Sequence, residues 1–318
     1  MTIGVELERL KQILAGQLAP ERVRADEPLA RHTFYRIGGP ADLLVTVESA
    51  AELAAVVALA RQHGVPFFIL GNGSNLLVAD AGLRGLVVEN QARAVQWLEG
   101  DDAATVRAES GASLSRLARE AARRGWDGLT WACGIPGTVG GGVVQNAGAH
   151  GSSLADVLHS IEVLDAGSHT RLMAVNELEL DYRDSRFRKP DAGQWVILTA
   201  EMALLRGDAA ALTARVAEYD TWRRMRQPAG ASCGSVFKNP TGDHAGRLIQ
   251  AAGLKGRRVG GAEISTLHAN FIVNHGGATA AGVLALIELA RQAVQQQFGV
   301  SLELEMQLVG CELANCNC

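Results

Sequence analysis

A serine, a lysine and an asparagine lie close together in the segment Ser232–Pro240, which reads Ser-Cys-Gly-Ser-Val-Phe-Lys-Asn-Pro. Ser235 follows a glycine, so a turn could present its hydroxyl with Lys238 and Asn239 nearby. The segment is not the nucleophile elbow of hydrolases, because Phe237 stands where that motif has its second glycine. Hydrolase chemistry is therefore disfavoured, and the pattern alone leaves open that Ser235 is an ordinary loop serine.

The segment Tyr182–Phe187 carries two arginines that could hold an anion. A guanidinium group stays protonated in proteins, so Arg183 or Arg186 would clamp or polarise negative charge rather than transfer a proton. The alternative interpretation is a surface segment in which Asp184 forms ion pairs with these arginines.

The segment Ser301–Leu308 alternates polar and apolar residues, which predicts a β-strand. Its apolar side chains would share one face, and Glu303, Glu305 and Gln307 would share the other. A half-buried strand with a solvated polar face is the interpretation that the pattern alone favours. A catalytic role would require one glutamate to project into a cleft as an acid or a charge stabiliser.

Glycine is concentrated in two stretches, residues 71–75 and residues 134–151, and the second contains seven of the chain's 36 glycines. Backbone without side chains can adopt positive φ and approach a flat or anionic ligand closely. Neither stretch matches the dinucleotide fingerprint, which places its glycines between a strand and a helix. We therefore expect one large ligand held by two bare loops, with amides of the first loop replacing a helix N-terminus.

Predicted strands and helices surround these segments. A strand at 42–47 precedes a helix that opens at the capping box Ser49–Glu52 and carries an apolar stripe of Leu53, Val56, Val57 and Ala60. A strand at 66–70 leads into the first glycine stretch, which joins it to a further strand. Ser113 caps an expected helix at 112–124. The other expected elements are strands at 76–78, 85–89, 104–109, 160–165, 171–175, 195–200 and 271–273, and helices at 208–226, 243–252 and 279–298.

Composition limits the class of protein. The chain has 318 residues, 47% of them apolar, and no run is apolar enough over the length needed to span a membrane. Its amphipathic start is not a signal peptide, so we expect a cytoplasmic location. With a net charge of −4 and no basic stripe, nucleic acid is not an expected partner. Five cysteines, three of them after residue 310, do not predict a disulfide framework.

Taken together, these segments resemble the UDP-N-acetylenolpyruvoylglucosamine reductase (MurB) family, flavoenzymes of peptidoglycan precursor synthesis. The resemblance covers almost the whole chain, and its specificity comes from the order and spacing of motifs that are individually weak. The matching segments are residues 32–41, 70–77, 134–141, 146–151, 182–185, 234–240, 268–274 and 304–306.

This resemblance implies an α+β protein. An FAD-binding domain of the PCMH or vanillyl-alcohol-oxidase type would occupy residues 1–205, with α+β subdomains at about 20–95 and 96–205. A MurB-type C-terminal substrate domain would occupy residues 206–310. Residues 311–318 would form a tail without a counterpart in the family.

The resemblance also implies an activity. NADPH would reduce bound FAD, which would then reduce UDP-N-acetylglucosamine enolpyruvate to UDP-N-acetylmuramate by hydride transfer to the vinyl carbon. The expected partners are these two small molecules, and the chain is expected to be a monomer without membrane insertion. Two alternatives are another FAD oxidoreductase of the same fold and a non-catalytic nucleotide-binding module.

Residue roles follow from the same resemblance, position by position. Arg183 matches the family's arginine that stabilises developing negative charge, with Glu305 assisting, and Ser235 matches the proton donor. The expected substrate contacts are Tyr182, Arg226, Lys238 and Asn239. No metal is expected. The expected FAD contacts are Gly71, Asn72, Gly73, Ser74, Asn75, Leu76, Gly134, Ile135, Pro136, Gly137, Gly141, Asn146, Ala147 and Gly148.

The chain also departs from the family pattern. It lacks the tyrosine-bearing insertion after residues 182–185 that clamps the substrate in one subgroup, and so resembles the shorter subgroup. Cys233 stands where alanine is common, and Gln145 and His150 replace residues that are often methionine and tyrosine.

Overall fold

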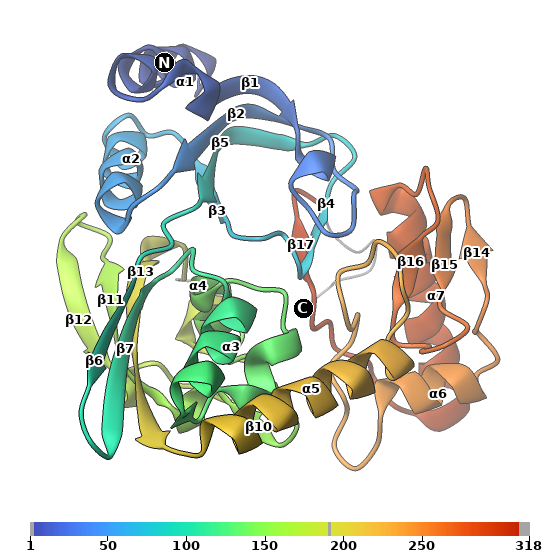
Figure 1. Ribbon diagram of the computed structural model, residues 1–318. Helices are drawn as coiled ribbons and strands as arrows, with labels where there is room; N and C mark the ends of the chain where they lie inside the picture. Colours follow the sequence, from blue (N-terminus) through green and yellow to red (C-terminus); the bar gives the residue numbers. More distant parts are fainter. Residues whose placement is uncertain (1–2, 190–191, 312–318) are drawn as a thin grey trace. The chain divides into compact units, whose positions relative to one another are not determined.

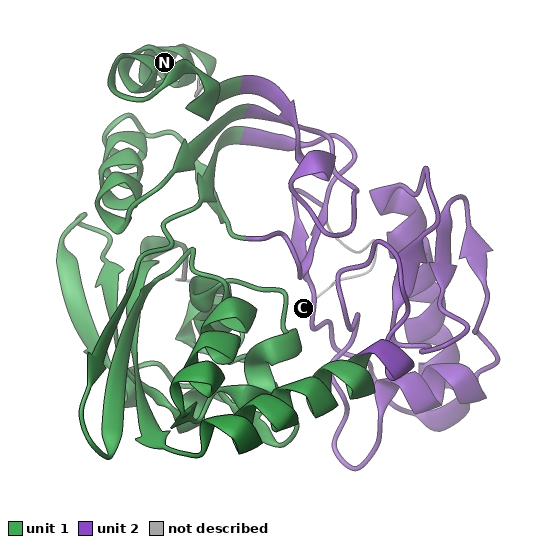
Figure 2. Ribbon diagram, in the orientation of Figure 1, with its two compact units in different colours: residues 1–24, 43–71, 85–223 green, residues 25–42, 72–84, 224–318 purple. Residues whose placement is uncertain are grey.

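The computed structural model describes residues 3–189 and 192–311, and the chain divides into two compact units (Figure 2). Unit 1 contains residues 1–24, 43–71 and 85–223, and unit 2 contains residues 25–42, 72–84 and 224–318. Unit 2 therefore draws on three separated stretches of the chain. The contiguous domains at 1–205 and 206–310 remain predictions, because compactness alone does not define a domain.

The largest sheet of unit 1 is antiparallel, with strand order β12-β11-β13-β7-β6 and with β8 paired to β13 (Figure 1). Its apolar side chains share one core with α3 (Leu114–Arg124). The Ser113 side chain caps α3 by accepting the Arg116 amide, as predicted. The strands predicted at 160–165, 171–175 and 195–200 correspond to β11 (Leu158–Leu164), β12 (Thr170–Ala174) and β13 (Val196–Arg206). The other strands of this sheet are β6 (Val95–Glu99), β7 (Ala103–Glu109) and β8 (Trp126–Asp127).

A second sheet has the strand order β1-β2-β5-β3, and its strands β3 and β5 are parallel. Two helices, α1 (Ile3–Gln17) and α2 (Ala50–Gln62), pack their apolar side chains against this sheet in one hydrophobic core. The buried residues of this core all belong to unit 1. The predicted stripe of α2 is confirmed, because all four of its residues are buried. The strands are β1 (Val23–Pro28), β2 (Pro40–Val47), β3 (Phe67–Leu70) and β5 (Leu83–Asn90).

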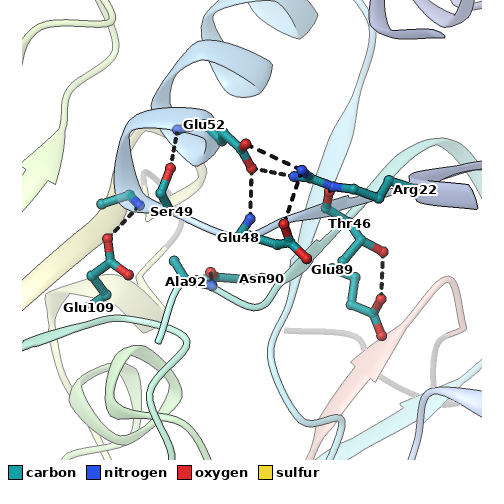
Figure 3. Close-up of polar contacts among 10 residues, drawn as sticks. Arg22, Thr46, Glu48, Ser49, Glu52, Glu89, Asn90, Ala92 and Glu109 are labelled. Carbon is teal, nitrogen blue, oxygen red and sulfur yellow. Dashed lines mark hydrogen bonds and ion pairs between the residues drawn. The ribbon is translucent and has the colours of Figure 1, made fainter. Parts of the chain in front are cut away.

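The start of α2 shows how local side chains set a helix boundary (Figure 3). The Ser49 hydroxyl accepts the Glu52 amide at 3.2 Å, which is the first half of the predicted capping box. The Glu52 carboxylate accepts the amide of Glu48 at 2.8 Å, one residue before the position that the box requires. The same carboxylate forms an ion pair with Arg22, and hydrogen bonding to Arg22 lowers the pKa of Glu52.

The long helix α7 (Ala280–Phe298) organises unit 2. The carboxylate of Asp80 caps it by accepting the amides of Ala280 and Ala281 at 2.7 and 3.0 Å. The buried residues of α7 recur at helical spacing and join one apolar core with α6. The other elements are α6 (Ala245–Ala251) and an antiparallel sheet of β14 (Arg258–Val259), β15 (Ala262–Ile264) and β16 (Ile272–Asn274).

The longest helices of the described residues are α7 and α5 (Ala209–Arg226), at 19 and 18 residues. Both were predicted, within two residues at each end. No helix among the described residues has both the length and the apolar character needed to cross a membrane.

The predicted closing strand at 301–308 is wrong over most of its length. Only β17 (Gln307–Val309) is regular, and it pairs in parallel with β4 (Leu76–Val78). Before it, the amides of Glu305 and Met306 both donate to the carbonyl of Val236, at 2.9 and 3.4 Å. A regular ladder directs successive amides to opposite sides, so the chain bends here as it does at a β-bulge.

Candidate active site

The first glycine stretch connects β3 to β4, and only glycine fits near its centre. Gly73 has φ +60°, and a Cβ atom there would lie 2.4 Å from the carbonyl oxygen of His32. Its own carbonyl accepts the amide of Phe34 at 3.0 Å. Within the described residues, no acceptor receives the amides of Gly73, Ser74 and Asn75, although Gly73 is buried. Three consecutive amides without an acceptor in the described chain can donate to an external one such as an anion.

The second glycine stretch contains a short helix where a bare loop was expected. The helix α4 (Val139–Val144) is capped by Thr138, whose hydroxyl accepts the Gly141 amide at 3.2 Å. The Gly140 amide donates to the carbonyl of Ser110 at 2.8 Å, and a Cβ at Gly140 would lie 2.8 Å from the Ser110 Cβ. Gly140 therefore serves close packing inside unit 1, whereas Gly141 is exposed, and its contact with the cofactor remains a prediction.

Arg183 lies against the end of the second glycine stretch. Its Nη2 atom donates to the carbonyl of Gly148 at 2.6 Å, and its backbone has φ +52°, which is rare for a residue with a side chain. Its guanidinium carbon lies 5.6 Å from the ring centroid of Tyr182, whose side chain is exposed. Unit 1 thus brings an expected catalytic residue, an expected substrate contact and an expected cofactor contact together.

Asn146 has a structural role in the same region. Its side chain is buried, donates to the carbonyl of Asp181 at 3.0 Å and accepts the amide of Ala155 at 3.1 Å. These bonds fix the turn before Tyr182 to the second glycine stretch. The predicted contact between Asn146 and the cofactor remains a prediction.

Unit 2 brings Ser235 and Glu305 onto adjacent backbone segments. The Val236 carbonyl accepts the Glu305 amide at 2.9 Å, and the Glu305 carbonyl accepts the Asn75 side chain at 3.2 Å. Ser235 and Glu305 are half-buried, whereas the side chain of Glu303 is 75% exposed. An expected proton donor, an expected charge stabiliser and one end of the first glycine stretch therefore meet in this unit.

Three expected substrate contacts also lie in unit 2. The Lys238 ammonium lies 3.7 Å from the carboxylate of Glu303 and is largely buried. Asn239 is exposed, and its side-chain oxygen accepts the amide of Ala245 at the start of α6 at 3.1 Å. Arg226 is exposed at the C-terminal end of α5.

Cys233 is an inert neighbour of these residues. Its thiol is buried and lies 3.9 Å from the sulfur of Met306. Burial raises the pKa of Cys233 to about 12, and the negative charge of Glu305 acts in the same direction. A thiol that stays protonated is neither a nucleophile nor a metal ligand.

Sequence analysis assigned no role to Asn270 of unit 2. Its side chain hydrogen-bonds to the backbone beside Ser235, and its only signal in the sequence was its place in the matching segment 268–274.

Sequence analysis also assigned no role to His150 of unit 1. Its ring stacks on Tyr219 with centroids 3.8 Å apart and meets Trp222 edge-on at 5.1 Å. Burial, and then the charge of Arg223, lower the pKa of His150.

Comparison with known proteins identifies the family. Residues 41–172 match the model of an FAD binding domain, and residues 226–309 match that of the UDP-N-acetylenolpyruvoylglucosamine reductase C-terminal domain. The reductase of Chloroflexus aurantiacus is 45% identical over 292 residues, which is 91% of this chain and 98% of that protein. The reductase of Rubrobacter xylanophilus is 48% identical over 287 residues, 90% of this chain and 94% of that protein.

A solved structure agrees. The crystal structure of UDP-N-acetylenolpyruvylglucosamine reductase from Thermus caldophilus is 37% identical, covers 90% of this chain and 99% of its own, and gives a TM-score of 0.76. The chain belongs to the UDP-N-acetylenolpyruvoylglucosamine reductase family. It is therefore an FAD-containing oxidoreductase, and the expected α+β fold of an FAD-binding domain followed by this family's C-terminal domain is confirmed.

The residues present fit the FAD that this family requires. A pyrophosphate needs hydrogen-bond donors, and the amides of Gly73, Ser74 and Asn75 are three consecutive donors without a protein acceptor in the described chain. In unit 1, the side-chain oxygen of Gln145 is buried and has no hydrogen-bond partner among the described residues. An acceptor of this kind suits an N–H or O–H group of a bound molecule.

Proposed function

We propose that this chain catalyses the NADPH-dependent reduction of UDP-N-acetylglucosamine enolpyruvate to UDP-N-acetylmuramate in peptidoglycan precursor synthesis. The names of its relatives supply the substrate class. The observation that carries the proposal is that the backbone segments of Ser235 and Glu305 are adjacent, because the Val236 carbonyl accepts the Glu305 amide at 2.9 Å. This arrangement suits a reaction in which a proton and a developing negative charge are handled side by side.

The turn residues Gly73, Ser74 and Asn75 would hold the FAD pyrophosphate through their backbone amides. Residues 134–137, Gly141 and Gly148 are the proposed contacts of the second stretch. Bound FAD would supply the hydride-transfer chemistry between NADPH and the vinyl carbon of the substrate.

Two charged residues have proposed roles at the carbon next to the hydride acceptor, where negative charge develops. A guanidinium group is a cation in proteins, and the bond of Arg183 to the Gly148 carbonyl holds its guanidinium in a fixed orientation. Glu305 is the better candidate than Glu303 for the assisting carboxylate, because Glu303 is exposed and pairs with Lys238.

Ser235 is proposed to donate the proton that completes the reaction. A serine hydroxyl is a very weak acid in water, so this role needs a strongly basic enolate and a fixed position beside it. Lys238, Asn239, Tyr182 and Arg226 are the proposed substrate contacts. The bond from the Ala245 amide to the Asn239 oxygen orients the Asn239 NH₂ group, which stays available as a donor.

We further propose that the enzyme is a monomer and that it is located in the cytoplasm, where NADPH and nucleotide sugars are available.

Replacement of Ser235 by alanine tests the proposal, with Ser232→Ala as the matched control three residues away. Flavin reduction by NADPH should survive in both variants. Oxidation of the reduced flavin by the enolpyruvyl substrate should fall by about 10²–10⁴-fold in Ser235→Ala only, because one proton donor is lost. Stopped-flow flavin absorbance separates the two half-reactions.

Three results would count against the proposal. Equal loss of both half-reactions in Ser235→Ala would make Ser235 a structural residue. A wild-type flavin that NADPH reduces, but that the enolpyruvyl substrate does not oxidise, would indicate another FAD oxidoreductase of this fold. Ligand binding without flavin reduction would indicate a nucleotide-binding module.

A further inference from the structure

Asn270 holds the backbone that follows Ser235. It is 3% exposed, and its side-chain oxygen accepts the Phe237 amide at 3.0 Å while its NH₂ group donates to the Phe237 carbonyl at 2.8 Å. Its own carbonyl accepts the Val236 amide at 2.9 Å. Three hydrogen bonds from one buried residue therefore bind the two residues directly after Ser235.

The same two residues hold the backbone of Glu305. The Val236 carbonyl accepts the Glu305 amide at 2.9 Å, and Phe237 forms an isolated bridge with Leu304. Residues 235–237 belong to no regular strand, so these few bonds replace the ladder that would otherwise fix their register. The position of Ser235 relative to Glu305 thus depends on Val236 and Phe237, which depend on Asn270.

We propose that Asn270 is a positioning residue, which orients Ser235 and Glu305 for the protonation step of the reaction. This inference rests on the function proposed above. An amide suits the role because it donates and accepts at the same time, as both bonds to Phe237 require. An aspartate can do the same only when it is protonated, which makes the role testable by pH.

The experiment compares substitutions at Asn270 with the same substitutions at Asn274, four residues later in the same unit. The Asn274 side chain also uses both polar groups, since it donates to the Tyr35 carbonyl at 3.0 Å and accepts the Gly276 amide at 2.8 Å. Its side chain forms no hydrogen bond with residues 235–237 in the described chain, and it is not assigned to the catalytic machinery. Asn274, which is half-buried, therefore controls for the loss of a side-chain amide that bonds through both of its polar groups.

Asn270→Ala should keep the wild-type rate of flavin reduction by NADPH. Its flavin oxidation by the enolpyruvyl UDP-sugar should slow by roughly 10²-fold, the cost of a misplaced reacting group. Asn274→Ala should leave the ratio of the two rates at the wild-type value. Circular dichroism melts of each variant confirm that it is folded.

Asn270→Asp adds a readout that a purely structural role would not move. Burial raises the pKa of an aspartate, and the neutral carboxyl can donate to the Phe237 carbonyl as the amide does. The oxidation rate of Asn270→Asp, relative to wild type, should therefore rise as the pH falls from about 8 to about 6. Asn274→Asp should show no such recovery. If Asn270→Ala does not fold, the pH dependence of Asn270→Asp tests the inference without it.

Two results would overturn the inference while leaving the proposed function intact. One is equal slowing of both half-reactions by Asn270→Ala. The other is an Asn270→Asp rate ratio that does not change with pH. A wild-type chain whose reduced flavin is not oxidised by the enolpyruvyl substrate would refute the proposed function and the role of Asn270 together.

Discussion

Two adjacent glycines of α4 should respond in opposite ways to the same substitution. Gly140 is buried, and a Cβ there would lie 2.8 Å from the Ser110 Cβ and 3.1 Å from the Ser110 carbonyl oxygen. Gly141 is exposed, and its nearest Cβ contact would be the Thr138 hydroxyl at 3.4 Å. Alanine should therefore overpack the chain at residue 140 and fit at residue 141.

Ser110 cannot move away cheaply. Its hydroxyl accepts the Asn90 side chain at 2.8 Å, its amide donates to Leu198 at 2.9 Å and its carbonyl accepts the Gly140 amide at 2.8 Å. Overpacking a fixed neighbour costs about 1–3 kcal/mol. Both substitutions gain the helix propensity of alanine over glycine, about 1 kcal/mol, and this gain cancels between them. The free energies of unfolding of the two variants should differ by about 1–3 kcal/mol.

Urea unfolding of the FAD-free variants, followed by circular dichroism, measures this difference. With a slope of about 3 kcal/mol/M, the Gly140→Ala midpoint should lie about 0.3–1 M below that of Gly141→Ala. FAD titration by fluorescence tests the proposed cofactor contact of Gly141. Gly141→Ala should bind FAD more weakly while its free energy of unfolding stays at or above the wild-type value. Equal midpoints for the two variants would refute the assignment of Gly140 to internal packing.

Three further predictions test other contacts. Because hydrogen bonding to Arg22 lowers the pKa of Glu52, its carboxylate should stabilise the fold above the ordinary value of 4.5 and lose this effect as the pH falls through the lowered pKa. As the pH falls below 4.5, Glu52→Gln should therefore lose less free energy of unfolding than wild type, measured by urea unfolding. An equal loss in the two proteins would contradict this. Asp80→Asn removes a charge and one of the two carboxylate oxygens that accept amides at the start of α7, so its unfolding free energy should fall by about 1 kcal/mol. A wild-type unfolding free energy would contradict the capping role of Asp80. Glu305→Gln should slow flavin oxidation by the substrate far more than Glu303→Gln, and the reverse order in stopped flow would exchange their roles.

Local patterns predicted most of the helices and strands correctly. The apolar stripe of α2 and its Ser49 cap depend on residues within a few positions of one another, so the sequence contains the whole signal. The same reasoning failed for α4, because glycine has a low helix propensity and argues for a loop. Its conformation is stabilised by the amides of Val139 and Gly140, which donate to Ala112 and Ser110.

The closing segment failed for a related reason. Alternation of polar and apolar residues predicted a continuous strand, yet Glu305 and Met306 share one carbonyl acceptor on a distant segment. Glu305 is half-buried there, while Glu303 is exposed. The difference in burial between the two glutamates therefore accompanies a tertiary bend that no local pattern encodes.

By itself, the sequence determined the family, most of the longer helices and strands and the residue types that can do chemistry, because motifs and periodicities are read from neighbouring positions. Only the tertiary structure decided how those residues are held. Asn270 bonds to Phe237 across 33 residues of chain, and Asn75 bonds to Glu305 across 230. Hydrogen bonds of such long sequence separation leave no local signature, since they form only once apolar burial has brought the segments together.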